Sequence, residues 1–199
     1  MEASYFTRHP FAKDVIQLII FIVCVIIGTI LINSFVFRSY NVVGPSMEET
    51  LYTGDRLIVN RLPVTWSNLR GEDYLPERGQ IIVFKNPHYS RGIEDEYIVK
   101  RVIGLPGERV VLQNGVFTVY NDEHPEGFNP DDDNNGEPGT PTTGEVNTVV
   151  PSGSLFVAGD PRTGTYSYDS RNGLGTIPLY DVIGPVGIRI FPFTEMRFF

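Results

Sequence analysis

The sequence predicts a mainly β fold, in which one domain built on antiparallel sheet follows a single transmembrane helix near the N-terminus. Residues 15–37 form an apolar run without a charged side chain. The rest of the chain consists of short β-branched segments broken by Gly and Pro, with little sustained helical periodicity. Asn114-Gly115 separates two of these segments and is a strong signal for a β-hairpin turn.

Length, charge and cysteine content narrow the class of protein. The 199 residues suffice for one domain beside the apolar run and a loop insertion. The net charge of −8 argues against nucleic acid as a partner, because binding to phosphates needs a basic surface. Cys24 is the only cysteine, which excludes an intramolecular disulfide and a cysteine metal cluster. We expect no metal and no cofactor, since H-E-x-x-H, P-loop and G-x-G-x-x-G motifs do not occur.

The apolar run, Val15 to Phe37, is long enough to anchor the chain in a membrane. As a helix it rises about 1.5 Å per residue and spans roughly 34 Å, which crosses the hydrocarbon core of a bilayer with some tilt. The alternative is a cleavable secretory signal, whose apolar core is shorter and ends in small residues. This run ends instead in Ser34-Phe35-Val36-Phe37-Arg38, so we expect a permanent anchor.

Eight later segments have the length and composition of strands. They lie at 40–43, 56–59, 80–84, 97–103, 109–112, 116–120, 154–158 and 182–191. Between the sixth and the seventh, residues 121–147 hold eight acids and four prolines but no Lys or Arg. Such a segment buries too little apolar surface to order itself, so we expect a mobile acidic insertion at the surface. Its Asp131 begins a series like that of an EF-hand loop, but Thr142 stands where the bidentate Glu belongs, which argues against calcium.

The first candidate for chemistry is Ser46, which follows the anchor closely. Gly44 and Pro45 force an irregular backbone before it, and such a turn can hold a hydroxyl at a fixed angle. An ordinary turn serine or a helix-capping serine would have the same local sequence.

The second candidate is Lys100, in the segment Tyr97-Ile98-Val99-Lys100-Arg101-Val102-Ile103. Under strand alternation Lys100 shares a face with Ile98 and Val102, so it is either buried or extends along the sheet to water. Burial would lower the pKa of the amine and produce a neutral base able to take a proton from a serine hydroxyl. A solvated lysine on a surface strand is the alternative.

The third candidate is a loop rich in hydroxyls and charges after residues 154–158. It contains Gly159-Asp160-Pro161-Arg162 and then Ser167-Tyr168-Asp169-Ser170-Arg171. It could supply a hydroxyl that orients a lysine and an Asp/Arg pair that holds the loop, although a solvated loop with surface ion pairs would look alike. His88 is the only histidine placed to act as a triad base, and its neighbours are typical of a polar turn.

Taken together and in this order, the three candidates resemble the type I signal peptidases, serine/lysine enzymes that remove signal peptides from exported proteins. Ser46-Met47 with Thr50-Leu51 and Gly54-Asp55 is similar to the nucleophile box of that family. Tyr97 to Gly107, with K-R-V-I-G-L-P-G, is similar to its lysine box, and Gly159-Asp160 through Asp169-Ser170-Arg171 is similar to its late box. The likeness covers the apolar run and nearly the whole domain except the acidic insertion.

The resemblance implies roles for individual residues. Ser46 would be the nucleophile, with its backbone N–H stabilising the oxyanion, and Lys100 would be the general base. Gly44 stands where the family often has a second oxyanion donor, and it has no hydroxyl to offer. The supporting residues would be Ser167, which hydrogen-bonds the base, and the pair Asp169 and Arg171.

Three departures from the family pattern concern loop geometry around the base. Glu49 stands where proline is usual, and Pro161 stands where asparagine is usual. The late box is two residues longer between Arg162 and Ser167.

Substrate recognition follows from the same resemblance. Signal-peptide-bearing preproteins would be the partners, with an extended peptide lying between the strand that enters Ser46 and the strand that carries Lys100. The pockets for small side chains would be lined by Tyr40, Val42, Tyr97 and Val99, although core packing would also explain these four residues. The Phe-rich segment 188–199 either rests on the lipid bilayer or forms a core strand with a frayed end.

Topology follows from the chemistry, because signal peptides emerge outside the cytoplasm. Residues 1–14 would be a cytoplasmic tail, 15–37 the transmembrane helix and 38–199 the extracytoplasmic domain, and the weak excess of basic residues before the run agrees. The competing hypothesis is a catalytically inactive anchored β module that binds peptides or scaffolds a secretion complex. A related repressor-type autoprotease would need a DNA-binding segment where this chain has its anchor.

Overall fold

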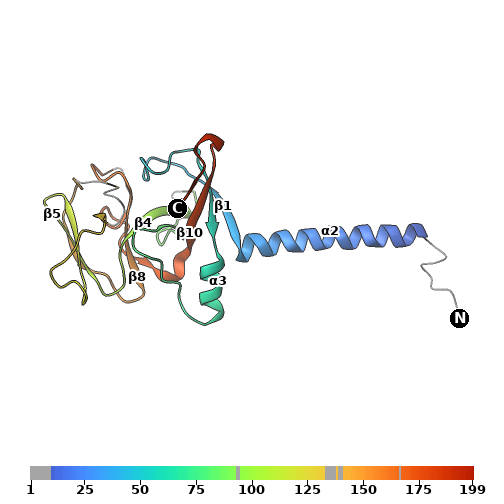
Figure 1. Ribbon diagram of the computed structural model, residues 1–199, viewed down its shortest axis with the longest axis horizontal. Helices are drawn as coiled ribbons and strands as arrows, with labels where there is room; N and C mark the ends of the chain where they lie inside the picture. Colours follow the sequence, from blue (N-terminus) through green and yellow to red (C-terminus); the bar gives the residue numbers. More distant parts are fainter. Residues whose placement is uncertain (1–9, 93–94, 133–137, 139–140, 166) are drawn as a thin grey trace.

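The computed structural model describes residues 10–92, 95–132, 138, 141–165 and 167–199 (Figure 1). A long helix, α2 (Pro10–Phe35), projects from a β domain that holds the rest of the described chain. The domain contains one large and one small antiparallel sheet, so the mainly β fold class is confirmed.

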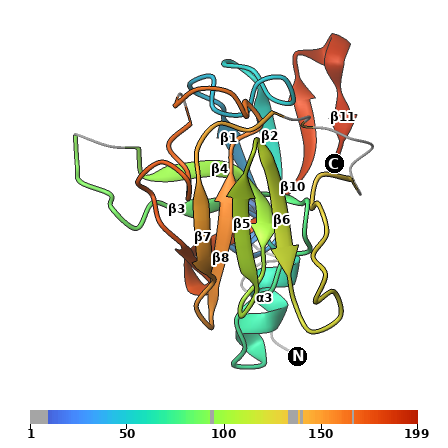
Figure 2. The ribbon, with the colours of Figure 1, turned by 90° about the vertical axis from the view of Figure 1, so that its left-hand side faces the viewer.

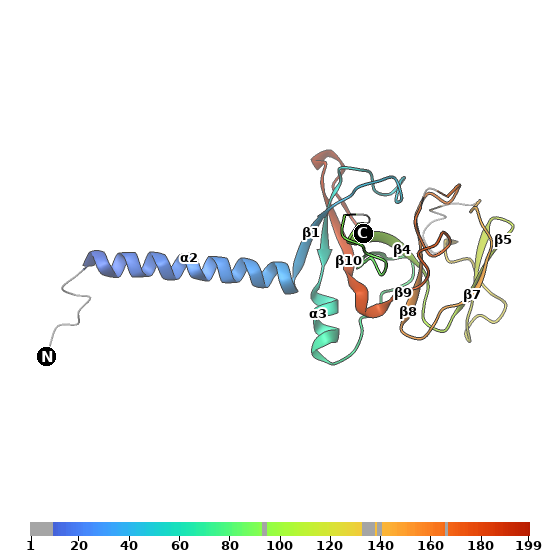
Figure 3. The ribbon, with the colours of Figure 1, turned by 180° about the vertical axis from the view of Figure 1, so that it is seen from behind.

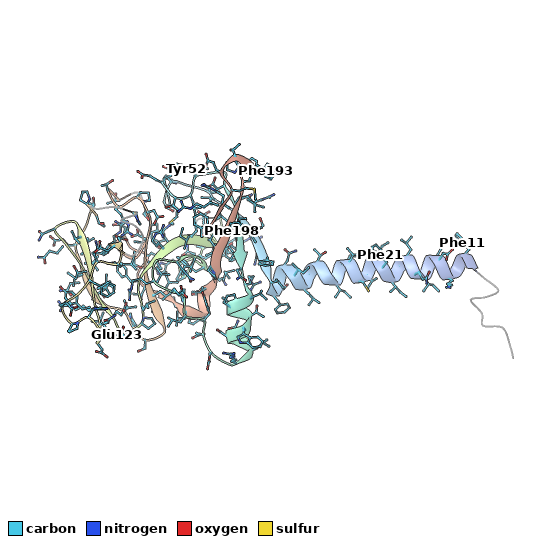
Figure 4. All side chains as sticks on the ribbon, in the orientation of Figure 1. Phe11, Phe21, Tyr52, Glu123, Phe193 and Phe198 are labelled. Carbon is cyan, nitrogen blue, oxygen red and sulfur yellow. The ribbon has the colours of Figure 1, made fainter. Side chains whose placement is uncertain are left out.

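Helix α2 carries the apolar run. Lys13–Val36 is long and apolar enough to cross a membrane, and none of it is buried against the domain. Figure 4 shows Phe11 and Phe21 on its exposed surface, away from the domain. The helix ends at Phe35, two residues before the end of the predicted run, because Phe37 already pairs with Asn60 as the first residue of strand β1 (Phe37–Asn41).

The large sheet runs through the centre of the domain. Its strand order is β1-β2-β10-β3-β4-β8-β9, and β11 pairs with β10. The bounds of the remaining strands are β2 (Arg56–Asn60), β3 (Ile81–Lys85), β4 (Tyr97–Gly104), β8 (Ser154–Ala158), β9 (Ile177–Pro178), β10 (Val182–Phe191) and β11 (Arg197–Phe198). The first predicted strand, 40–43, is displaced to Phe37–Asn41 by its pairing with β2, and the short β9 and β11 had no sequence signal.

The small sheet packs on the side of the domain away from α2, where Figure 2 shows it in front. It consists of β5 (Arg109–Gln113), β6 (Val116–Tyr120) and β7 (Val146–Val149), in the order β6-β5-β7. Asn114 and Gly115 both have positive φ, 53° and 79°, so the predicted hairpin turn joins β5 to β6.

Three apolar clusters form the core. One packs helix α3 (Leu62–Leu69) through Val64 against the large sheet, and another lies beneath the turn that follows β1. The third joins the two sheets, with Phe117 and Phe156 in edge-to-face contact. Two 3-10 turns, η2 (Leu179–Asp181) and η3 (Phe193–Glu195), flank β10.

The acidic insertion is more closely packed than the sequence predicts. Residues 133–137 and 139–140 lie outside the described residues. On either side of them, however, Asp131 and Thr142 are buried, and Phe128 pairs with Val119 of β6. Residues 146–147 already belong to β7. These residues therefore pack on the domain, because the domain supplies the basic and apolar partners that the segment itself lacks, and the mobility of the insertion stays a prediction.

The C-terminal segment divides between the two alternatives. β10 is a core strand with alternating buried residues, whereas Phe193 and Phe198, in the hairpin formed by β10 and β11, are 76% and 79% exposed (Figure 4). Contact between this exposed hairpin and the lipid bilayer stays a prediction.

Candidate active site

The turn that carries Ser46 is held on both sides by buried apolar residues. Val42 before it and Met47 and Leu51 after it lie in the core cluster beneath the turn. Gly44 has a φ of +87°, a conformation that favours glycine, and it lets the chain reverse between Val42 and Ser46. Ser46 itself stays half-buried. The local sequence thus produces a turn that is packed on the core on both sides, with Ser46 bordering the cleft.

The side chain of Lys100 reaches this hydroxyl from strand β4. Its Nζ lies 2.6 Å from Ser46 Oγ and 2.9 Å from the carbonyl oxygen of Val99. Lys100 is only 2% exposed. Of the two alternatives for Lys100, burial is therefore correct and a solvated surface lysine is wrong.

Burial changes the acid–base chemistry of Lys100. The pKa of the amine is lowered from 10.5 to about 8, and desolvation is the largest cause. The charges of Asp169 and Asp160 act in the opposite direction and raise this pKa, whereas the charge of Arg171 lowers it. At pH 7 about one amine in ten is then neutral. A neutral amine can donate one N–H to Val99 O and accept the hydroxyl proton of Ser46, which is the arrangement a general base requires.

Ser46 also offers a group that can stabilise negative charge. Its backbone N–H donates to no acceptor among the described residues. An ideal Cβ on Gly44 would meet nothing within 4 Å, so Gly44 leaves open space beside the turn and supplies no side-chain donor. The N–H of Ser46 is therefore unpaired among the described residues, and its role as an oxyanion donor stays a prediction.

Asp169 and Arg171 lie behind the base and hold the late loop. Asp169 is fully buried, accepts the backbone N–H of Gly159 at 2.9 Å and pairs with Arg171 Nη2 at 2.6 Å. Arg171 also donates to the carbonyl oxygens of Pro161 and Arg162. This pair closes the loop onto the end of β8, so it supports the site without touching Ser46.

Ser167 is close to the site but does not bond the base. Its hydroxyl is buried and has no hydrogen-bond partner among the described residues, so the expected bond to Lys100 is not formed. A Cβ added to Gly159 would collide with both Ser167 Oγ and Ser46 O. Gly159 thus packs closely against both Ser46 and Ser167. Val99 O takes the place expected for Ser167, because it lies within reach of the lysine on the same strand.

Two buried ion pairs extend this support, and the sequence did not predict their partners. Arg101, next to the base, binds Asp160 through two bonds of 2.8 and 2.7 Å. Arg162 binds Asp131 of the acidic insertion at 2.6 Å. The partners of Asp160 and Arg162 thus lie on other elements, whereas the predicted pair of Asp169 and Arg171 forms within the loop.

A cleft of ≈ 890 Å³ opens at Ser46 and Lys100. All four residues predicted to line the substrate pockets border it, together with Gly44, Asn86 and Tyr168. The four are Tyr40, Val42, Tyr97 and Val99. The rings of Tyr40 and Tyr97 are 5.2 Å apart, and Arg38 lies over both rings. These residues also pack on the core, so the core interpretation is correct, and their role as substrate pockets stays a prediction.

The cleft is bordered by backbone that has no strand partner among the described residues. β8 pairs with β4 only from Arg101 onward, so residues 97–100 are paired with β3 alone. β1 is the edge strand of the large sheet, and the chain continues from it into Ser46. An extended peptide can therefore add to these edges.

The position of His88 bears on the alternative of a histidine base. His88 is exposed, and its Nδ1 lies 2.9 Å from Tyr168 Oη on the rim of the cleft, so it is not placed as a base for Ser46. No group of three or more His, Cys, Asp or Glu among the described residues could hold a metal ion.

Comparison with known proteins gives consistent matches. The family model described as signal peptidase, peptidase S26, matches residues 13–191. Signal peptidase I T of Bacillus subtilis (strain 168) is 36% identical over 178 residues, covering 88% of this chain and 85% of that protein. Signal peptidase IB of Staphylococcus aureus (strain MRSA252) is 30% identical over 203 residues and is matched over 94% of both chains. A crystal structure of a signal peptidase I from Enterococcus faecalis V583 matches with 26% identity and a TM-score of 0.37, covering 56% of this chain and 96% of that one.

Proposed function

The chain belongs to the signal peptidase family, peptidase S26, and on that premise we propose that it removes signal peptides from exported preproteins with Ser46 as nucleophile and Lys100 as general base. Membership of the family makes it a serine endopeptidase. The observation that supports the assignment of the two residues is the distance of 2.6 Å between Lys100 Nζ and Ser46 Oγ in a buried setting.

The proposed reaction uses one proton shuttle. Ser46 Oγ attacks the scissile carbonyl carbon while its proton passes to the neutral amine of Lys100, and the backbone N–H of Ser46 stabilises the resulting oxyanion. The ammonium of Lys100 then gives that proton to the leaving amine, and the C–N bond breaks. Water attacks the acyl-enzyme with Lys100 again as base, which releases the carboxylate and restores the serine.

The cleft supports binding of the preprotein as an extended strand. The unpaired edges of β1 and of residues 97–100 offer backbone hydrogen bonds on two sides of the peptide. Tyr40, Val42, Tyr97 and Val99 then limit the size of the side chains that point into the cleft, and they favour small residues near the scissile bond.

The proposal includes an orientation in the membrane. Helix α2 spans the bilayer, residues 1–14 remain in the cytoplasm, and the β domain lies on the extracytoplasmic side, where signal peptides emerge. The acidic insertion belongs to the extracytoplasmic domain.

Substitution at the two residues tests the mechanism. Ser46→Ala and Lys100→Ala should each abolish cleavage of a preprotein with an A-x-A site in detergent or vesicles, and retained activity in either variant would refute the dyad. An acylating inhibitor should label Ser46 in the parent chain but not in Ser46→Ala. Absence of any labelling together with absence of cleavage would favour the inactive peptide-binding module instead.

A further inference from the structure

Helix α3 presents an apolar face that the described chain does not cover. Leu62, Trp66 and Leu69 are 48%, 59% and 76% exposed. Their spacing of four and then three residues places them on one side of a helix. Val64 faces the other way and is buried in the core. The helix therefore has apolar side chains on two sides, and the larger apolar face is turned outward.

The first turn of α3 is bonded to the last turn of α2. Thr65 Oγ donates to the carbonyl oxygen of Phe35 at 2.8 Å, and the backbone N–H of Arg61 donates to that of Val36, also at 2.8 Å. Arg61 Nη1 reaches the carbonyl oxygen of Asn33 at 3.4 Å. These bonds satisfy carbonyl groups that the end of α2 leaves unpaired. They place α3 at the level where the apolar helix leaves the membrane.

The direction of α3 also suits this level. Figures 1 and 3 both show α3 running across the direction of α2, on the side of the domain from which α2 emerges. A helix that crosses a membrane-spanning helix in this way lies along the membrane surface.

We propose that α3 lies in the membrane–water interface, with Leu62, Trp66 and Leu69 inserted at the boundary between headgroups and acyl chains. The proposal rests on the anchoring by α2 proposed above. Tryptophan is the side chain most typical of this boundary, since its ring is apolar and its N–H is polar. The guanidinium of Arg70 lies 5.0 Å from the centre of the Trp66 ring and is exposed, which leaves it free to meet lipid phosphates.

A second attachment changes what the anchor can do. A single helix would leave the domain free to pivot about the end of α2, whereas contacts at both α2 and α3 fix the tilt of the domain and the height of the cleft above the bilayer. An eight-residue helix is also marginal alone, so packing through Val64 on one side and lipid on the other stabilises α3. The interface contact would thus hold Ser46 at a constant distance from a substrate that is itself in the membrane.

The fluorescence of Trp66 tests the proposal directly, because it is the only tryptophan in the sequence. The full chain is reconstituted in vesicles of phosphatidylcholine and phosphatidylglycerol that carry bromine either near the headgroup end or near the methyl end of the acyl chains. We expect bromine near the headgroups to quench the emission strongly, bromine near the methyl ends to quench it less, and aqueous acrylamide to quench it weakly.

A matched control carries its tryptophan on the far side of the domain. Val149 is 59% exposed on β7 of the small sheet, so the double variant Trp66→Phe, Val149→Trp should show no quenching by either brominated lipid and full quenching by acrylamide. The proposal is overturned if Trp66 behaves like this control.

Activity supplies an independent measurement. Leu69→Asp places a charge on the apolar face without removing a buried side chain, so we expect several-fold slower cleavage of a membrane-embedded preprotein and parental cleavage of a soluble peptide. If Leu69→Asp cleaved both substrates at the parental rates, the contact would not position the cleft. A parent chain that cleaves neither substrate while Trp66 is quenched by lipid would instead refute the proposed function and leave the interface contact intact.

Discussion

The amine of Lys100 lies 2.6 Å from the hydroxyl oxygen of Ser46, although 54 residues separate them in the chain. The amine comes from a central strand and the hydroxyl from a turn after the edge strand, and the cleft opens where they meet. The expected pH dependence of activity follows from the protonation state of this amine.

The rate of peptide cleavage should rise with pH. The pKa of Lys100 is lowered to about 8, and only the neutral amine can accept the serine proton, so kcat/KM should increase through a midpoint near that value and then level off. The measurement is a pH profile of kcat/KM with a soluble peptide from about pH 6 to about pH 10. A flat profile would contradict the role of Lys100 as base.

Lys100→Met should remove activity without weakening the fold. Methionine has a similar length and no charge. Burial lowers the pKa of Lys100 from 10.5 to about 8, so the charged form of the lysine destabilises the folded state at any pH at which the amine is protonated. The variant should therefore equal or exceed the parent in free energy of unfolding at pH 7, by at most about 3 kcal/mol. Chemical denaturation measures the difference, and a clear loss of stability would contradict the desolvation argument.

The same lowered pKa makes the stability of the parent chain depend on pH. Between about pH 8 and 10.5 the folded state binds fewer protons at Lys100 than the unfolded state, so this contribution to stability rises with pH across that window. The slope should be absent in Lys100→Met, which can be tested by comparing denaturation midpoints of the two chains.

Asp160→Asn should shift the pH profile to lower pH as well as destabilise the fold. The charge of Asp160 raises the pKa of Lys100, so its removal lowers that pKa, while Arg101 is left as a buried, unpaired charge, which costs about 3–5 kcal/mol. Asp55→Asn is the matched control. Asp55 is also buried against an arginine, Arg189, but it does not act on Lys100, so its variant should lose stability without a shift of the midpoint.

Ser167→Ala tests whether the Ser167 hydroxyl bonds to Lys100, as the family resemblance implies, or stays unpaired, as in the structure. The buried hydroxyl of Ser167 has no partner among the described residues, so its removal should leave the fold unchanged or more stable by about 1 kcal/mol. We expect kcat to fall less than in Lys100→Ala, because Val99 O already holds the amine. A loss of activity as complete as that of Lys100→Ala would show that the hydroxyl turns to the base during the reaction.

Gly159→Ala should damage the site through packing alone. The new Cβ would collide with Ser46 O, which is a backbone atom, and with the side chain of Ser167, whose Cβ lies 2.8 Å away, so relief requires a shift of the turn or the loop. Overpacking of this kind costs about 1–3 kcal/mol, and the displaced Ser46 should lower kcat more than it changes KM. Gly187→Ala is the control, since Gly187 does not have a positive φ and a Cβ there makes only ordinary contact, 3.6 Å from Ile58 O. Equal kcat values for these two variants would contradict the close approach at Gly159.

Much of this protein can be predicted from local pattern. The apolar run, the alternation of the strands and the Asn114-Gly115 turn depend on neighbours a few residues away, and all three appear in the structure. The motif around Ser46 and the strand of Lys100 were visible for the same reason. Helix α3 escaped prediction because it is short and carries Pro63 and β-branched residues, and because packing through Val64 and bonds to the end of α2 hold it in place.

Packing between distant segments decided the rest. Spacing along the chain could not decide whether Lys100 is buried or solvated, which residue pairs with Asp160, or whether the amine of Lys100 bonds to Ser167 or to Val99 O. Burial and ion pairing depend on which elements the sheet brings together, and a desolvated charge takes the partner nearest in space. The residue types thus determined which chemistry is possible. The contacts between β4, β8 and the turn at Ser46 determined the protonation of the Lys100 amine and the groups to which it bonds.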